Sequence, residues 1–437
     1  MQNININVNS EIGKLEGVII HQPGPEIESM SPENASEALY SDILNRSVAL
    51  PEYNGFSGVL KIYTKVFEVN NLLEETLADT SVKHNLVKII CAKEQHDGEG
   101  ICNLIDEINN KELAKQLIQG IVMDKNNLTK FLSSDRYCFD PLPNLFFTRD
   151  ASFSVGNEVM ISNMASEVRD RETLIMDAIF KYHPVFKAVT VNSVALYNKS
   201  RVIKKEIIKD TKEEVKKIAT IEGGDVLVAR DDILIIGNGA RTTTQGVDSV
   251  IEHIKTKTGK HHIIVQQLPH EPDSFIHLDM VFTLLDKNTC MVYKPLILEL
   301  NKYATIHITI DNHKVSDIKE EKNILDALRP LGMDLEPIMC GGVNDSLLMK
   351  REQWHSGANF FTLEPGKIVG YARNVNTINA LNKNGFDVVS ANDIILGNTT
   401  FDDHKKIVVT IEGNELVRGG GGARCMSMPV SRQKVDW

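Results

Sequence analysis

The strongest constraint on the fold of this chain is a local pattern that recurs five times. Each segment has an alternating apolar run, a polar turn and, in all but the first, a clear second apolar run. Two such runs around a turn rich in Gly, Asn, Asp or Pro are typical of a β-hairpin. The last four segments therefore predict hairpins, whereas the first predicts a single strand. The segments span residues 13–24, 150–164, 223–239, 277–294 and 357–374.

Segments with helical spacing of apolar residues alternate with these five. The predicted helices lie at 166–182, 244–259, 316–332 and 375–385, and a final strand is expected at 405–413. Recurrence of one unit predicts a single α/β domain over residues 1–437 rather than several unrelated domains.

Residues 70–134 depart from this alternation. Their patterns are helical and lack strand signals, as in the run "EGICNLIDEINNKELAKQLIQGIV". We interpret them as an inserted helical subdomain, the alternative being a set of ordinary surface helices.

Composition narrows the classes of partner and compartment. The net charge of -11 argues against nucleic acid, which favours a concentrated basic face. Apolar runs stay well short of the roughly 20 residues that span a membrane, and the first residues do not resemble a secretory signal. The six cysteines form neither a CxxC pair nor a zinc-ligand spacing. We expect a cytoplasmic protein whose cysteines are mostly buried thiols.

Polar residues stand at equivalent edges of the repeats, in "NLFFTRD", "IEGGD", "HLD" and the terminal "RGGGGARC". If the repeats pack around one axis, these edges converge and place a thiol, an imidazole and several carboxylates in one cavity. The residues concerned are Asp150, Glu222, Asp225, His277, Asp279 and Cys425.

Such a cluster suits attack on a cationic carbon. A thiolate is the nucleophile, carboxylates pair with the donor fork of a guanidinium, and histidine moves protons at neutral pH. Water would then complete a hydrolysis.

Each element also has a simpler interpretation. An isolated cysteine is more often buried and inert, "EGGD" is more often a turn, and "HLDM" is usually the start of a strand with a solvated edge. Asp150 beside Arg149 is consistent with a surface ion pair. A phosphate loop is disfavoured because the glycine run lacks a GK[ST] ending and no helix follows it.

A metal site is the chemical alternative. The stretch "HEPDSFIHLD" carries His270, Glu271, Asp273, His277 and Asp279, and two histidines with a carboxylate suit a transition metal. We disfavour a metal because His277 and Asp279 are expected on one strand face while Pro272 leaves His270 in a loop. No HExxH helix is present.

Taken in order, "FTRD", "EGGD", "HLD" and "RGGGGARCMSMP" resemble the signature of the arginine deiminases, in the guanidino-group-modifying superfamily. The resemblance extends to "SEIGKLEGVIIHQPG", "RDRETL", "GNGARTT", "REQW" and "LEPGKIVGYARN", and so covers most of the chain. Each motif is weak alone, but their order and number make the resemblance specific.

The resemblance implies a five-bladed, pseudo-symmetric α/β propeller with an inserted helical subdomain. It implies hydrolysis of L-arginine to L-citrulline and ammonia through a covalent intermediate on cysteine, with neither metal nor organic cofactor. It leaves open an amidinotransferase or an arginine dihydrolase of the same fold, or a protein that binds arginine without turnover. We also expect a homo-oligomer, a dimer or higher.

The resemblance also implies roles for individual residues. Cys425 would attack the guanidinium carbon, and His277 would protonate the departing ammonia and then activate water. Asp150 and Asp279 would clamp the guanidinium nitrogens, with Glu222 facing the reacting centre and Asp225 supporting it. The expected substrate-binding residues are Arg169 and Arg241 at the carboxylate, Asn144 and Phe147 at the amino-acid end, and the backbone at Gly419. Without the resemblance, Arg169 looks like a surface charge on a helix.

Two positions depart from the commonest family pattern. Gly420 stands where certain members have a basic residue, and Tyr53 where a histidine is frequent. These departures bear on substrate affinity and loop closure rather than on the chemistry.

Overall fold

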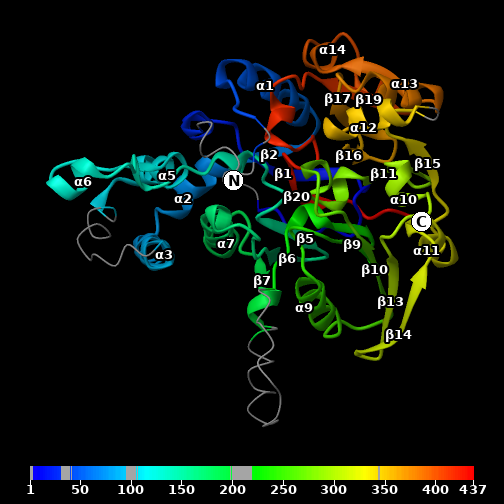
Figure 1. Cartoon of the computed structure of the whole chain (residues 1–437), viewed down its shortest axis with the longest axis horizontal. Coiled ribbons are helices and arrows are strands. Elements are labelled where there is room, and N and C mark those ends of the chain that lie inside the picture. Colours follow the sequence, from blue (N-terminus) through cyan, green and yellow to red (C-terminus); the bar gives the residue numbers. More distant parts are fainter. Residues whose placement is uncertain are drawn as a thin grey trace.

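The computed structural model describes residues 3–30, 40, 42–94, 105, 107–196, 198, 219–342 and 345–437. The chain has a mixed α/β fold of several small sheets with helices packed beside them (Figure 1). Among the described residues, no helix is long and apolar enough to cross a membrane.

The four predicted hairpins are present, and each gains a third strand. In all four sheets the hairpin is antiparallel and its second strand pairs in parallel with a strand from later in the chain. The strands are β5 (Ser152–Val155), β6 (Glu158–Ile161) and β7 (Val189–Val191); β8 (Val226–Arg230), β9 (Ile233–Asn238) and β10 (His261–Gln267); β11 (Phe282–Asp286), β12 (Thr289–Val292) and β15 (Glu336–Met339); and β16 (Phe361–Glu364), β17 (Lys367–Tyr371) and β19 (Ile407–Ile411), which β18 (Asp387–Ser390) extends.

The first repeat is completed by the other end of the chain. β20 (Met428–Arg432) pairs antiparallel with β1 (Leu15–Ile20), and β1 pairs in parallel with β2 (Lys65–Glu68). This sheet therefore has the same pairing pattern as the other four. The expectation that 405–413 is the final strand is wrong, because β20 follows it. Pro429 obscures β20 in the sequence, and an edge strand tolerates proline.

The third sheet carries an additional hairpin, β13 (Thr305–Asp311) with β14 (Lys314–Glu321). The helix predicted over 316–332 is therefore wrong in its first part, and α11 (Ile324–Leu328) begins only afterwards. β14 is an exposed edge strand whose charged residues resemble the solvent face of a helix. Charges on such an edge discourage pairing with other chains.

The remaining helices cover the sheets, which places apolar clusters between each sheet and its neighbours. They are α1 (Arg46–Tyr63), α7 (Asp170–Tyr182), α9 (Thr244–Ile254), α10 (Lys294–Ile297), α12 (Ser346–Trp354), α13 (Val375–Lys383) and α14 (Ala391–Ile395).

The predicted helical insertion is largely helical where it is described, and it forms an arm on the left of Figure 1. It contains α2 (Val69–Thr76), α3 (Thr80–Lys93), α5 (Asn110–Gln119) and α6 (Leu128–Leu132). Residues 95–104 and 106 lie outside the described residues. The expected absence of strands is wrong, because β3 (Ile121–Val122) pairs with β4 (Tyr137–Phe139). α2, α3 and α5 share one apolar cluster with α7 and β1.

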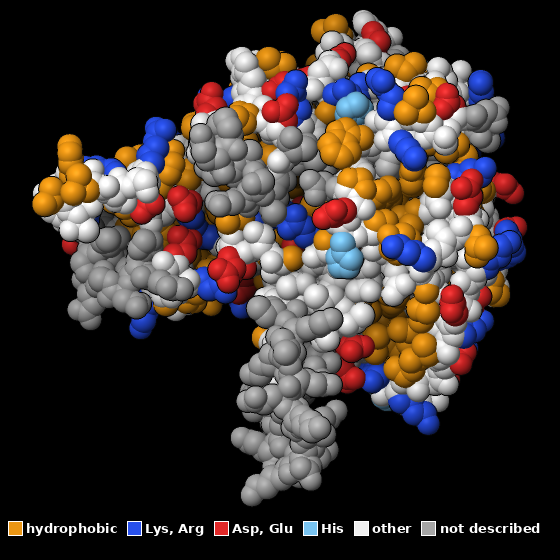
Figure 2. Space-filling view, viewed as in Figure 1, with side chains coloured by type: hydrophobic (Ala, Val, Ile, Leu, Met, Phe, Trp, Pro, Cys, Tyr) orange, Lys and Arg blue, Asp and Glu red, His pale blue; other side chains and the backbone are white. Residues whose placement is uncertain are grey.

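The surface in Figure 2 mixes acidic and basic side chains rather than separating them into fields of one sign. Apolar side chains gather at the end of the arm, where Leu128, Phe131 and Leu132 are 73%, 68% and 72% exposed.

Candidate active site

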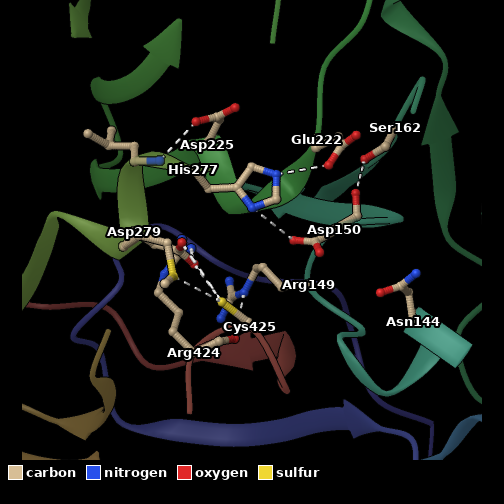
Figure 3. Close-up of polar contacts among 12 residues, drawn as sticks. Asn144, Arg149, Asp150, Ser162, Glu222, Asp225, His277, Asp279, Arg424 and Cys425 are labelled. Carbon is tan, nitrogen blue, oxygen red and sulfur yellow. Dashed lines mark hydrogen bonds and ion pairs between the residues drawn. The ribbon is translucent and has the colours of Figure 1, made fainter. Parts of the chain in front are cut away.

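The polar residues at the repeat edges converge, as the sequence predicts. Each stands shortly before the first strand of a sheet, β5, β8, β11 or β20. They therefore occupy equivalent places and lie close together at the centre (Figure 3). Asp150, Glu222, His277, Asp279 and Cys425 are all at most 4% exposed.

The imidazole of His277 lies between two carboxylates (Figure 3). Its Nε2 is 2.8 Å from Glu222 Oε2, and its Nδ1 is 3.7 Å from Asp150 Oδ1. Burial opposes protonation, but Asp150 and Glu222 outweigh it and raise the pKa of His277 to about 9. Burial conversely raises the pKa of Glu222, but the hydrogen bond from His277 outweighs it, and the net shift is downward. The pair is therefore an imidazolium and a carboxylate near neutral pH.

The turn 223–225 makes this packing feasible. It is a 3-10 turn, Gly223–Asp225, that leads into β8. A Cβ on Gly224 would lie 2.5 Å from His277 Nδ1. Asp225 Oδ1 accepts a hydrogen bond from the Leu278 N–H at 2.9 Å, which joins the turn to the His277 segment. Burial raises the pKa of Asp225 to about 6.

The "HLD" motif lies on a turn rather than on a strand. Leu278–Met280 forms a 3-10 turn, so the expectation that His277 and Asp279 share one strand face is wrong. On this turn His277 faces Glu222 and Asp150, while Asp279 faces Cys425. The turn stands directly before β11, so its apolar residues Leu278 and Met280 resemble the start of that strand in the sequence.

The Cys425 thiol lies among Asp279, Asn359 and Met280. Its Sγ is 3.7 Å from Asp279 Oδ2, 3.9 Å from Asp279 Oδ1 and 4.0 Å from Met280 Sδ. The Asn359 side chain donates to Sγ at 3.2 Å. Burial, with Asp279 and Asp150 adding to it, raises the pKa of Cys425 well above its ordinary value.

Arg424, the neighbour of Cys425, is fully buried and holds Asp279. Its Nη1 donates to Asp279 Oδ2 at 2.7 Å, and its Nε and Nη2 donate to the two oxygens of Glu11 at 3.0 Å each. Sequence reasoning missed both residues. Glu11 lies 413 positions from Arg424, and a single acidic residue near the start of a chain gives no signal of this pairing.

Arg169 is not the surface charge that helical periodicity suggests. It is 3% exposed at the start of α7, where its Nη1 donates to Asp150 Oδ2 at 2.7 Å. Its Nε and Nη2 donate to Glu172, and Nη2 also reaches the Asn144 backbone oxygen at 3.4 Å. A surface ion pair between Arg149 and Asp150 is likewise wrong, because both are buried and Arg149 Nε donates to the Arg424 backbone oxygen.

A cavity of about 420 Å³ opens beside this site. It is lined by Ala165, Ser166, Glu167, Ala240, Arg241, His270 and Ile276. Ala165 donates its backbone N–H to Glu222 Oε1 at 2.9 Å, and Ile276 precedes His277, so the cavity adjoins the buried residues. Arg241 is half-buried there.

Arg241 and Arg169 both act electrostatically on Glu222, since each lowers the pKa of that carboxyl. Phe147 is buried against Phe146 and against the backbone of Gly419, where a Cβ would lie 3.0 Å from the Phe147 ring. Phe147 thus contacts Gly419, and its backbone N–H donates to the Asn144 backbone oxygen at 2.9 Å.

Comparison with known proteins gives a consistent result. The model of the family described as arginine deiminase matches residues 36–432. The chain belongs to the arginine deiminase family. An arginine deiminase of Mycoplasma capricolum subsp. capricolum is 31% identical over 445 residues, covering 99% of this chain and 98% of that protein. One from Streptococcus agalactiae is 31% identical over 451 residues and covers 98% of each chain.

Among solved structures, the amidinotransferase SxtG of Microseira wollei, from the saxitoxin biosynthetic pathway, has a TM-score of 0.51 at 13% identity. The match covers 98% of each chain. At this identity the likeness shows the shared α/β fold alone.

The terminal glycine run of this family member packs against the side chains of Phe147 and Asn359. A Cβ on Gly421 would lie 2.5 Å from the Phe147 ring, and one on Gly422 would lie 2.6 Å from Asn359 Oδ1. Gly420 has a φ of 82° and open space around it. Tyr53, the other departure from the commonest arginine deiminase pattern, is fully buried in α1.

Among the described residues, Asp150, Glu222 and His277 are the only group placed to share an ion, with ligand atoms within 4.8 Å of one another. In the stretch that we weighed, and disfavoured, as an alternative metal site, His270 and Glu271 are exposed whereas His277 and Asp279 are buried. The side chain of Asp273 lies outside the described residues.

Proposed function

We propose that this chain hydrolyses L-arginine to L-citrulline and ammonia at Cys425, which makes it a hydrolase of the guanidino C–N bond. Membership of the arginine deiminase family supports the activity. The observation that carries the assignment of the site is the burial of one thiol, one imidazole and three carboxylates in a single cluster. A cluster with this net negative charge suits a cationic substrate.

Each of the two guanidinium clamps has one oxygen held by a protein arginine. Asp150 Oδ2 accepts from Arg169, and Asp279 Oδ2 accepts from Arg424, both at 2.7 Å. Asp150 Oδ1 is buried without a hydrogen-bond partner, and Asp279 Oδ1, which Arg424 does not hold, lies 3.9 Å from Sγ, slightly farther than Oδ2 at 3.7 Å. We infer that the protein arginines orient each carboxylate, and that the other oxygen of each receives a nitrogen of the substrate.

The substrate itself favours the reactive form of the thiol. In the free enzyme, burial and carboxylates favour the thiol over the thiolate. A guanidinium bound between Asp150 and Asp279 neutralises those carboxylates and adds positive charge beside Sγ, which lowers the pKa of Cys425.

The chemistry then proceeds in two stages. The Cys425 sulfur bonds to the guanidinium carbon as the bond to one terminal nitrogen breaks, and that nitrogen takes a proton from His277 and leaves as ammonia. Water then gives a proton to His277 as its oxygen bonds to the same carbon. The carbon–sulfur bond breaks and restores the thiolate, while the oxygen loses its second proton to solvent, and L-citrulline is released. The raised pKa of His277 keeps it protonated for the first stage.

The amino-acid end of the substrate is assigned to the cavity. Arg241 lines it and would bind the carboxylate. Arg169 would assist, but Asp150 and Glu172 already occupy its donors, so Arg241 is the better placed of the two. Asn144, Phe147 and the Gly419 backbone would enclose the aliphatic chain.

Three wider expectations belong with this proposal. The five sheets with one pairing pattern are the blades of a propeller, into which residues 70–134 are inserted. The reaction uses neither metal nor organic cofactor, since thiol, imidazole and carboxylates supply every step. Cytoplasmic location and a homo-oligomeric state stay predictions.

Product analysis by mass spectrometry tests the function. Incubation with arginine should give citrulline and ammonia in equal amounts without added metal. Ornithine in place of citrulline would overturn it, with a second ammonia pointing to a dihydrolase and dependence on an amine acceptor to an amidinotransferase. Binding of arginine without any product would indicate a non-catalytic protein.

A further inference from the structure

The buried side chain of Asn359 contacts both the Cys425 thiol and the backbone on either side of it in the site. It lies between the turn at Ser356 and β16, and it is 1% exposed. Its Nδ2 lies 3.2 Å from Cys425 Sγ and 3.2 Å from the Asp279 backbone oxygen. Its Oδ1 accepts the backbone N–H of Arg424 at 2.9 Å.

The surrounding backbone is shaped around this amide. A Cβ on Gly422 would lie 2.6 Å from Asn359 Oδ1 and 2.8 Å from its Cβ. Gly422 therefore lets the terminal segment approach Asn359 closely. The Asn359 N–H donates to the Ser356 backbone oxygen at 3.0 Å, which fixes the turn that carries the side chain.

The electrostatics of the sulfur give this contact a chemical consequence. Asp279 lies within 4 Å of Sγ, and its charge opposes formation of a thiolate there. An N–H donor acts in the opposite direction, because hydrogen bonds to charged acceptors are stronger than those to neutral ones. Gly422 contributes a backbone hydrogen bond with the same effect, and Asn359 contributes the side-chain donor.

We propose that Asn359 is a catalytic residue whose side-chain N–H stabilises the Cys425 thiolate while its carbonyl oxygen holds the main chain of the nucleophile in place. The amide keeps both its protons, and no covalent bond forms at it. This rests on the proposed function only in taking Cys425 as the nucleophile.

The test replaces Asn359 with aspartate, which has nearly the same shape. Asn359→Asp keeps an oxygen for the Arg424 N–H and replaces the donor toward Sγ with a second oxygen. The measurement is the rate at which iodoacetamide alkylates Cys425 in the free enzyme across pH, followed by peptide mass spectrometry. We expect the midpoint to rise by about one pH unit or more, and kcat for arginine to fall about 10- to 100-fold with a smaller change in KM.

Asn374→Ala is the matched control. Asn374 is also buried, 2% exposed, and its side chain donates to the His355 backbone oxygen rather than to the site. Its loss should lower stability without moving the alkylation midpoint. Asn359→Ser, which keeps a shorter donor, should fall between wild type and Asn359→Asp, and it serves if the aspartate variant does not fold.

An unchanged midpoint in a folded Asn359 variant, or an equal shift in Asn374→Ala, would overturn the role of Asn359. The alkylation profile requires no turnover, so it decides this role even if wild-type enzyme makes no citrulline. Failure of the proposed function is then recognised separately, from the products.

Discussion

In each half of the site a buried arginine holds an aspartate, but the two halves differ in how far apart along the chain the bonded residues lie. On the His277 side, Arg169 holds Asp150, and the two residues are 19 positions apart beside an open cavity. On the Cys425 side, Arg424 holds Asp279 and is itself held by Glu11, 413 positions away. The proposed nucleophile therefore depends on contact between the chain's two ends, whereas the ion pair on the proposed proton-transfer side joins residues that are close in sequence.

Replacement of the proposed nucleophile should have the largest effect on activity. Cys425→Ala should lower kcat by about 10⁴-fold or more, because loss of a covalent nucleophile removes the first bond-forming step. Citrulline formation over long incubations measures it. Truncation before Cys425 should also abolish activity, since it removes β20 and with it the partner of β1. Substantial turnover by Cys425→Ala would sink the assignment of the nucleophile.

The next test compares Asp150 and Asp279, the two carboxylates proposed to bind the guanidinium. Asp150→Asn and Asp279→Asn should each lower kcat/KM for arginine by about 10²- to 10³-fold, since each removes a buried charge facing the guanidinium. Steady-state kinetics on both variants make the comparison. A clamp whose loss costs less than tenfold would show that the device is not shared, and the site would then rely on one carboxylate.

The closure of the chain's ends is tested at Glu11. Glu11→Gln removes the counter-charge that lies on Arg424 and leaves a buried guanidinium partly uncompensated. Loss of one partner of a buried ion pair costs about 3–5 kcal/mol, so the free energy of unfolding in urea should fall by that order. Glu16→Gln is the control, because Glu16 is on the same segment but exposed. Equal stability of the two variants would contradict the closure argument.

The sequence predicts those structural features that are formed within a short segment of the chain. The four hairpins and the convergence of Asp150, Glu222, His277, Asp279 and Cys425 follow from period-two patterns and turn residues, which short segments contain in full. The sequence does not predict β20 or β14, because a proline obscures the first edge strand and charged residues obscure the second.

The contacts that orient the site could not be found this way. Asn359 meets Cys425 across 66 positions and Glu11 meets Arg424 across 413, so neither pair has a common local pattern. Helical periodicity predicts Arg169 on the surface, because it does not register a charge that is buried at the start of a helix. Only the family resemblance predicts that Arg169 binds the substrate, and this stays a prediction.

The two halves of the site should contribute to stability with opposite dependence on pH. The pKa of His277 is raised from 6.5 to about 9, so its contribution to folding is complete below pH 6.5 and is lost as pH rises through 9. The pKa of Glu11 is lowered from 4.5 to about 2, so its contribution is present above pH 4.5 and is lost as pH falls through 2.

Urea unfolding of wild type, His277→Gln and Glu11→Gln across pH checks this. The deficit of His277→Gln should shrink as pH rises from 6.5 to 9, and that of Glu11→Gln should shrink only in acid. A His277→Gln deficit that stays constant across that alkaline range would show that the carboxylates do not hold the imidazole charged.

Substitutions in the glycine run beside Cys425 should have the smallest effects. Gly420→Ala meets open space, so its cost is the strain of a left-handed backbone, about 1–2 kcal/mol of folding free energy. Gly421→Ala places its Cβ 2.5 Å from the Phe147 ring and 3.0 Å from the Cys425 Cβ, so it must displace the nucleophile as well. We expect Gly420→Ala to lose stability with kcat within about threefold of wild type, and Gly421→Ala to lose both. If Gly420→Ala were the more damaging to kcat, the run would act by moving over the substrate rather than by packing behind the thiol.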